Sequence, residues 1–73
     1  MTPSGFVGWR YSELARMLFD AGYREVSRKG SHRSWKHPID PKLLTVKDPG
    51  SGPVAPGYIR LACKRVAALG RGA

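Results

Sequence analysis

The chain has few acidic residues, a single cysteine and no long apolar run. Its 73 residues include 13 lysines and arginines but only 5 aspartates and glutamates, which gives a formal net charge of +8. A charge of this size argues against a binder of neutral metabolites and favours a polyanion or an acidic protein as the partner. The basic residues are spread from Arg10 to Arg71, which indicates a folded basic surface instead of a disordered basic tail.

The lone cysteine, Cys63, excludes an internal disulfide. No segment has the length and apolarity of a membrane-spanning helix or a signal-peptide core, so we expect a cytoplasmic protein with no membrane partner. We expect one small domain over residues 1–73, with flexible ends at residues 1–8 and 70–73. In a domain of this size any catalysis must take place on an open surface.

Apolar residues at helical spacing predict a first helix near the start of the chain. They follow the pattern i, i+3, i+4, i+7 and are Leu14, Met17, Leu18 and Ala21. The helix should run from about Ser12 to Ala21, with Ser12 as its cap. It should end at Gly22 in a left-handed conformation, with Tyr23 folded back on Leu18.

The same spacing predicts a second helix at the other end, from about Gly57 to Leu69. Its apolar positions are Ile59, Ala62, Cys63 and Val66. Arg60 and Lys64 form a basic row on another face of this helix. Cys63 is therefore expected to be a small core residue.

Three short segments between the helices have the composition of strands. They are Tyr23 to Arg28, Ser31 to His37, and Leu43 to Val46. Lys29-Gly30 supplies the first turn, and the segment from Asp48 to Pro56, rich in proline and glycine, reads as a loop. We expect Val26 and Trp35 to face the core. Period-two alternation then places the other face of the second strand outward, with His32, Ser34 and Lys36.

The predicted order is α-β-β-β-α. It defines an α+β fold with a three-stranded antiparallel sheet and two helices on one face, which leaves the other face to solvent or a ligand. This is the order of the double-stranded-RNA-binding domain fold.

The segment Arg28-Lys29-Gly30-Ser31-His32 is the best candidate for a functional site. The basic side chains can hold phosphate oxygens, Gly30 allows a close backbone approach, and histidine is the side chain that ordinarily titrates nearest neutrality. The candidate RNA-binding residues are Arg28, Lys29, Gly30, Ser31, Arg33, Lys36 and Lys64. The five acids are scattered along the sequence, so we expect no metal site and no cofactor. His37 lies five residues beyond His32 and should face the other way, so we interpret it as structural or incidental.

Several short motifs in this order resemble the HicA-type toxins, the small mRNA interferases of bacterial toxin-antitoxin pairs. They are Ser12-Glu13-Leu14, Ala21-Gly22-Tyr23, Lys29-Gly30-Ser31-His32, His37-Pro38, Thr45-Val46, and Pro56-Gly57 before Ile59-Arg60. The resemblance implies an endoribonuclease with His32 as the catalytic histidine, mRNA as its substrate and a HicB-type antitoxin as its partner. A Pro-x-His that similar proteins often carry after the third strand is replaced here by Lys47-Asp48-Pro49.

Two other functions are compatible with the sequence. One is a non-catalytic RNA-binding module that uses the same fold to recognise duplex RNA by its shape. The other is a component whose sole role is to bind an antitoxin-like regulator. Degradation of RNA would distinguish the nuclease from both.

Overall fold

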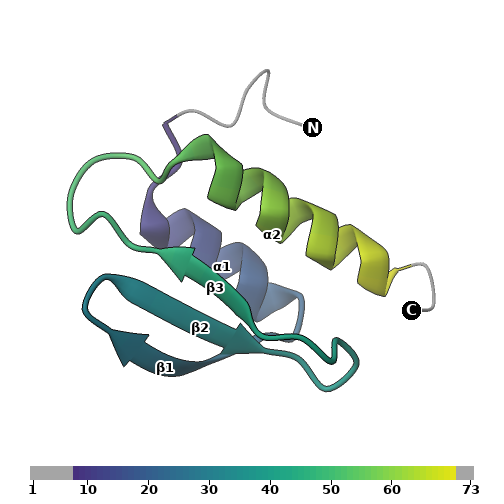
Figure 1. Ribbon diagram of the computed structural model, residues 1–73. Coiled ribbons are helices and arrows are strands. Elements are labelled where there is room, and N and C mark those ends of the chain that lie inside the picture. The colour runs from purple at the N-terminus through teal and green to yellow at the C-terminus, as the bar shows by residue number, and fades with distance from the viewer. Residues whose placement is uncertain (1–7, 71–73) are drawn as a thin grey trace.

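The computed structural model describes residues 8–70 and confirms the predicted order of elements (Figure 1). The elements are α1 (Tyr11–Asp20), β1 (Arg24–Lys29), β2 (His32–Lys36), β3 (Leu44–Lys47) and α2 (Pro56–Leu69). The three strands form one antiparallel sheet in the order β1-β2-β3. The flexible ends predicted from the sequence fall, except for Gly8 and Gly70, outside the described residues.

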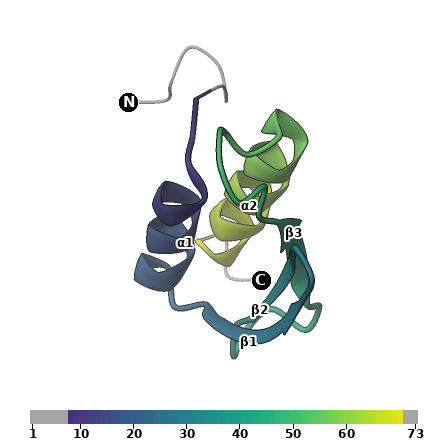
Figure 2. The same cartoon turned by 90° about the vertical axis from the view of Figure 1, so that its left-hand side faces the viewer.

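The molecule has two layers, with both helices on the same face of the sheet (Figure 2). The core lies between the layers and consists of Leu14, Leu18, Tyr23, Trp35, Leu44, Val46, Val54, Ile59 and Ala62. The predicted apolar faces of both helices are therefore confirmed, and so is the buried position of Trp35. No helix of residues 8–70 covers the opposite face of the sheet, which is called the outer face below (Figure 2).

Helix α1 begins earlier than predicted. Its N-cap is Arg10, whose backbone N–H donates a hydrogen bond to Glu13 Oε1 at 2.8 Å. Ser12 lies inside the helix, so the prediction that it caps the helix is wrong. The reason is tertiary: Tyr11 must itself be helical for its ring to pack against the core and its hydroxyl to reach the sheet.

The end of α1 agrees with the prediction. Gly22 has a φ of +102°, and the Tyr23 N–H donates to the Leu18 carbonyl at 2.9 Å. This is the Schellman arrangement that glycine favours after a helix, because a side chain is strained at positive φ. His37 holds the same corner from the other side: its Nδ1 accepts from the Ile39 N–H, and its Nε2 donates to the Ala21 carbonyl, both at 3.0 Å.

Strand β1 departs from regular alternation. The register shifts between Glu25 and Ser27, so that a bulge at Val26 adds one residue to the strand. Val26 is 54% exposed, and the prediction that it faces the core is wrong. The inward position is set by Tyr23, which is fully buried at the end of α1, and alternation from Tyr23 turns Val26 outward.

A polar network ties the end of the sheet to α2. Asp40 accepts a hydrogen bond from the Tyr23 hydroxyl and another from Arg65 Nε, each at 2.7 Å. The Arg65 guanidinium lowers the pKa of Asp40 to about 2, and burial raises the pKa of Tyr23 to about 12. At neutral pH the carboxylate is therefore charged and the phenol is a donor, as the network requires.

We predict that Asp40→Asn lowers the free energy of unfolding at pH 7 by roughly 2 kcal/mol, because a charged hydrogen bond to Arg65 is lost. Since the folded-state pKa of Asp40 is depressed, its contribution is complete above its ordinary pKa of 3.8 and is lost as the pH falls toward about 2. Urea unfolding at pH 7 and at pH 2.5 to 3 should show the difference from wild type shrinking at the lower pH.

The matched control is Asp20→Asn. Asp20 pairs with Arg16 on the solvent side of α1, where the side chains are 62% and 80% exposed. Its removal should change stability by less than about 0.5 kcal/mol. Equal losses in the two variants would contradict a special role for the Asp40 network.

Candidate nucleic-acid interface

His32 lies on the outer face of the sheet, flanked by a lysine on each neighbouring strand. It is exposed, and it is paired across the sheet with Lys29 of β1 and with Lys47 of β3. Residues directly opposite in antiparallel strands have Cβ atoms about 4.5 to 5.5 Å apart and project from the same face. The imidazole therefore stands between two ammonium groups at one end of the sheet.

The cross-strand pairs that follow along the outer face are polar. The second row contains Ser27, Ser34 and Thr45, and the hydroxyls of Ser34 and Thr45 are 3.0 Å apart. The third row pairs Arg24 with Lys36. The predicted placement of His32, Ser34 and Lys36 on the face opposite Trp35 is thus confirmed.

Arg28 and Arg33 lie on the other side of the sheet from His32. They are cross-strand partners, and Arg33 faces inward with a side chain only 14% exposed. The Arg28 Nε donates to the Glu25 carboxylate on the same face, which raises the pKa of Arg28. Arg28 and Arg33, which the sequence groups with His32 as candidate RNA-binding residues, therefore do not share its face. Arg33 alternates inward with Trp35, and the bulge at Val26 puts Arg28 on the same inner face, where its side chain is 65% exposed.

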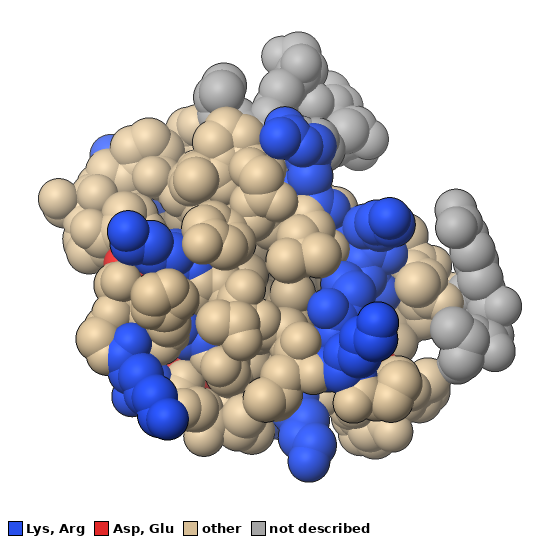
Figure 3. Space-filling view, viewed as in Figure 1, with Lys and Arg blue, Asp and Glu red and all other residues tan. Residues whose placement is uncertain are grey.

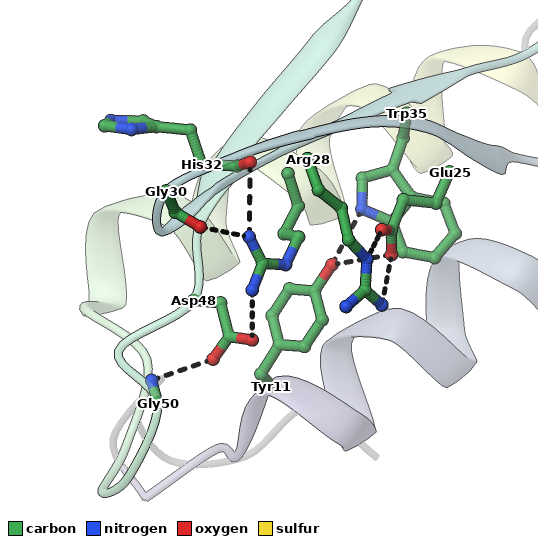
Figure 4. Close-up of polar contacts among 9 residues, drawn as sticks. Tyr11, Glu25, Arg28, Gly30, His32, Trp35, Asp48 and Gly50 are labelled. Atoms are coloured by element: carbon green, nitrogen blue, oxygen red, sulfur yellow. Dashed lines mark hydrogen bonds and ion pairs between the residues drawn. The ribbon is translucent and has the colours of Figure 1, made fainter.

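Arg33 braces the hairpin that carries His32. Its Nη1 donates to the Gly30 carbonyl at 2.7 Å and to the His32 carbonyl at 3.4 Å, and its Nη2 donates to Asp48 Oδ2 at 3.4 Å. The backbone N–H of Asp48 also donates to the Ser31 carbonyl at 2.7 Å. In Figure 4, His32 points away from this polar cluster, while Asp48 and Gly50 approach from the loop after β3. The turn at Gly30, with φ of +58°, is thus held to two strands and one loop.

A second group of contacts supports β1 and β2 from α1. The Trp35 Nε1–H donates to the Tyr11 hydroxyl at 3.2 Å, and that hydroxyl donates to Glu25 Oε1 at 3.4 Å (Figure 4). Burial raises the pKa of Tyr11 to about 12, so the phenol keeps its proton at neutral pH. The strand beneath the outer face is therefore anchored to the first helix.

Acids and arginines pair within the fold, whereas the lysines do not. Each ion pair among residues 8–70 joins an arginine to an aspartate or glutamate: Arg16–Asp20, Arg28–Glu25, Arg33–Asp48 and Arg65–Asp40. The remaining acid, Glu13, accepts from the Arg10 backbone. Within these residues no lysine forms an ion pair, so the lysine charges stay available to an external anion.

The positive charge is not confined to the outer face. Figure 3 shows lysine and arginine side chains in separate groups over α2 and beside the sheet, with almost no acidic side chain in view. Lys64 and Arg60 are exposed on α2, as predicted. Because α2 covers the opposite face of the sheet, Lys64 belongs to a different surface from His32 (Figure 2).

His37 and Cys63, whose side chains could in principle take part in chemistry, are both held by contacts within the fold. The His37 ring packs against Tyr23 with centroids 4.9 Å apart, in addition to its two backbone contacts. The Cys63 sulfur lies 3.9 Å from Met17 Sδ beside the core, and burial raises the pKa of its thiol. Both side chains are therefore engaged within the fold, and neither is paired with His32 across the sheet.

Metal-binding and membrane-spanning features are both absent from the described residues. Residues 8–70 contain no group of three histidine, cysteine, aspartate or glutamate side chains placed to hold a metal ion. In the same residues, neither helix is long and apolar enough to cross a membrane.

The comparisons with known proteins identify the family. Residues 11–67 match the family model described as the HicA toxin of bacterial toxin-antitoxin systems, and this match covers α1, the whole sheet and all but the last two residues of α2. The chain therefore belongs to the HicA toxin family, which implies an antitoxin as its partner. Neither the curated proteins nor the solved structures gave a match.

Sequence reasoning missed Lys47. It lies 15 positions beyond His32, and only the pairing of β2 with β3 makes the two residues neighbours. The signal available was its place directly after the predicted third strand, where a basic residue could extend the outer face by alternation from Val46.

We predict that Arg33→Lys loosens the hairpin, because one ammonium group cannot span both the Gly30 carbonyl and the Asp48 carboxylate. Stability should fall by about 1 to 2 kcal/mol. Amide hydrogen exchange should accelerate in the hairpin and the loop after β3 more than in the middle of α2.

Arg16→Lys serves as the control, since the Arg16–Asp20 pair is exposed and should tolerate the exchange. Exchange at the hairpin that is as slow in Arg33→Lys as in wild type would show that Arg33 does not brace it.

Proposed function

We propose that this protein is a metal-independent endoribonuclease that cleaves mRNA as the toxin of its toxin-antitoxin pair. The observation that supports it best is the position of His32, exposed on the outer face between Lys29 and Lys47. A general acid or base flanked by fixed positive charges is what phosphodiester cleavage needs. The family match adds a toxin role to this geometry.

The proposed reaction uses the RNA as its own nucleophile. The ribose 2′-hydroxyl attacks the adjacent phosphorus, and neutral His32 accepts the hydroxyl proton. The bond to the 5′-oxygen breaks, and that oxygen takes up a proton, from the imidazolium or from water. Lys29 and Lys47 stabilise the negative charge that develops on the phosphoryl oxygens. The products are a 2′,3′-cyclic phosphate and a 5′-hydroxyl, and DNA is not a substrate because it lacks the nucleophile.

The proposal assigns separate tasks to the predicted binding residues. Lys36 adds a further positive charge on the outer face, beyond Lys29 and Lys47. The Gly30-Ser31 turn lets the RNA backbone approach His32. Arg28 and Arg33 act on the RNA only indirectly, since Glu25 and Asp48 hold their guanidinium groups. Lys64 is too far around the molecule to share a phosphate with His32, and would contact a longer RNA or the antitoxin.

The proposed partner is a HicB-type antitoxin with an acidic surface. With a net charge of +8 and unpaired lysines around His32, the toxin offers a field that an acidic protein can neutralise while it covers the imidazole. Occlusion of the outer face would block RNA without any change in the toxin's fold.

His32→Ala is the decisive variant for catalysis. It should reduce RNA cleavage by about 10² to 10⁴-fold, the usual value of general acid-base catalysis, while RNA binding persists. Because His32 is exposed, stability should change by less than about 0.5 kcal/mol. The assay is cleavage of a defined RNA in EDTA, with urea unfolding on the same sample.

His37→Ala is the matched control. It should lower stability, since His37 holds the corner at Ala21 and Ile39, yet at saturating RNA the folded fraction should cleave at the wild-type rate, because His37 is not a neighbour of His32. Full activity in His32→Ala would move the chemistry to another residue. A wild-type protein that binds RNA without degrading it would instead favour the non-catalytic module.

The lysine pair predicts a specific salt dependence of RNA binding. For single-stranded RNA the logarithm of the affinity falls with the logarithm of salt concentration by about 0.7 per neutralised phosphate. Lys29→Ala and Lys47→Ala, measured in the His32→Ala background, should each flatten this slope by up to about 0.7. Lys42→Ala is the control, because Lys42 is exposed but lies in the connection between β2 and β3. Identical slopes in all three variants would exclude a phosphate clamp around His32.

A further inference from the structure

His32 lies at one end of the outer face, and the other end of the same face contains an open hollow of about 410 Å³. Its walls come from β1, β2 and the turn after β2, and its lining residues are Arg24, Val26, Lys36, His37, Pro38, Asp40 and Pro41. Carbon atoms of Val26, Pro38 and Pro41 offer an apolar surface, and Val26 is 54% exposed there. Val26 follows inward-facing Glu25 in regular alternation and therefore projects from the outer face.

The hollow is continuous with the row of residues around His32. Lys36 lies four residues beyond His32 on the same strand and the same face, a distance of about 13 Å at the rise of a β-strand. The hydroxyls of Ser34 and Thr45 lie between them and can accept or donate hydrogen bonds to a sugar-phosphate chain. An RNA strand extended along β2 would therefore need more than one nucleotide to reach from the lysine pair to the hollow.

The charges of the hollow suit a nucleic acid. Among residues 8–70 Lys36 has no ion-pair partner, and the one acid in the lining, Asp40, is already held by Arg65 and Tyr23. The polar group of Arg24 is likewise engaged, since it donates to the Phe19 and Tyr23 carbonyls and stacks on the Phe19 ring at 3.8 Å. What remains is an apolar aliphatic surface beside a positive charge. Such a surface can cover the face of an unpaired base by apolar contact while the cation holds the backbone.

We propose that this hollow is a subsite for one unpaired base of the RNA, located more than one nucleotide from the phosphate at His32. The inference rests on the proposed ribonuclease function and adds to it a second point of contact that fixes how the strand lies. Because the polar groups of Arg24 and Asp40 are already bonded within the protein, the subsite accepts any base and recognises its stacking surface instead of its edge. It therefore favours single-stranded RNA, whose bases are free to turn into the protein.

The test measures how much the bases of an RNA contribute to binding. Two short oligonucleotides are used, both with 2′-O-methyl riboses so that they cannot be cleaved: one carries bases and the other is abasic with the same phosphates. In the wild-type protein the strand with bases should bind more tightly, and Val26→Asn should reduce that ratio by about fivefold, which corresponds to roughly 40 Å² of buried apolar surface. In NMR spectra the Val26 methyl signals should shift upfield with the first strand only.

The control and the outcomes separate this proposal from the proposed function. Leu61→Asn replaces an apolar side chain, 38% exposed, on α2 and should leave the ratio unchanged. An unchanged ratio in Val26→Asn, or no binding of either oligonucleotide, would overturn the base subsite. If Val26→Asn weakened binding to the antitoxin but not to the oligonucleotide with bases, the base subsite would also be overturned, and the hollow would be a protein-docking site. Cleavage of unmodified RNA is assayed separately, so a protein that binds bases here without cutting RNA would contradict only the proposed catalysis.

Discussion

The position of Trp35 in the core determines what the outer face of this protein presents. Trp35 is 4% exposed and is fixed by a hydrogen bond to Tyr11, which leaves β2 one register only. Because side chains alternate along a strand, that register sends His32 outward and Arg33 inward. A slip by one residue would bury the imidazole and expose the guanidinium. The proposed chemistry therefore depends on one aromatic side chain three residues from the proposed catalytic group.

The division of labour between arginine and lysine follows from the same arrangement. Planar guanidinium groups bind carboxylates and carbonyls in a fixed geometry, and here they link elements: Arg33 joins the hairpin to the loop after β3, and Arg65 joins α2 to the segment before β3. Four of the five acids are engaged by arginine side chains, and the fifth, Glu13, accepts a hydrogen bond from the Arg10 backbone. The lysines retain their charge on the surface, and the two that lie beside His32 give that part of the outer face its positive potential.

Sequence patterns were sufficient for the elements and for the face on which His32 lies, because apolar spacing and the Gly22 cap are local signals. They were insufficient where the fold depends on pairing between strands. Val26 was placed inward because it is apolar, although alternation from Tyr23 turns it outward. The bulge after it, which puts Ser27 on the outer face and Arg28 on the inner face, cannot be read from the sequence of β1. Lys47 became a neighbour of His32 only through the register of β3, which no local pattern specifies.

The chemistry of the RNA ends tests the central claim, that His32 and its flanking lysines direct the attack of a 2′-hydroxyl on its own phosphate. Mass spectrometry of the fragments from a defined RNA, cut by the wild-type protein in EDTA, identifies both new termini. The account predicts a 2′,3′-cyclic phosphate, or the monophosphate formed by its hydrolysis, together with a 5′-hydroxyl. Fragments that carry a 3′-hydroxyl and a 5′-phosphate would show that water is the nucleophile and would contradict the proposed mechanism.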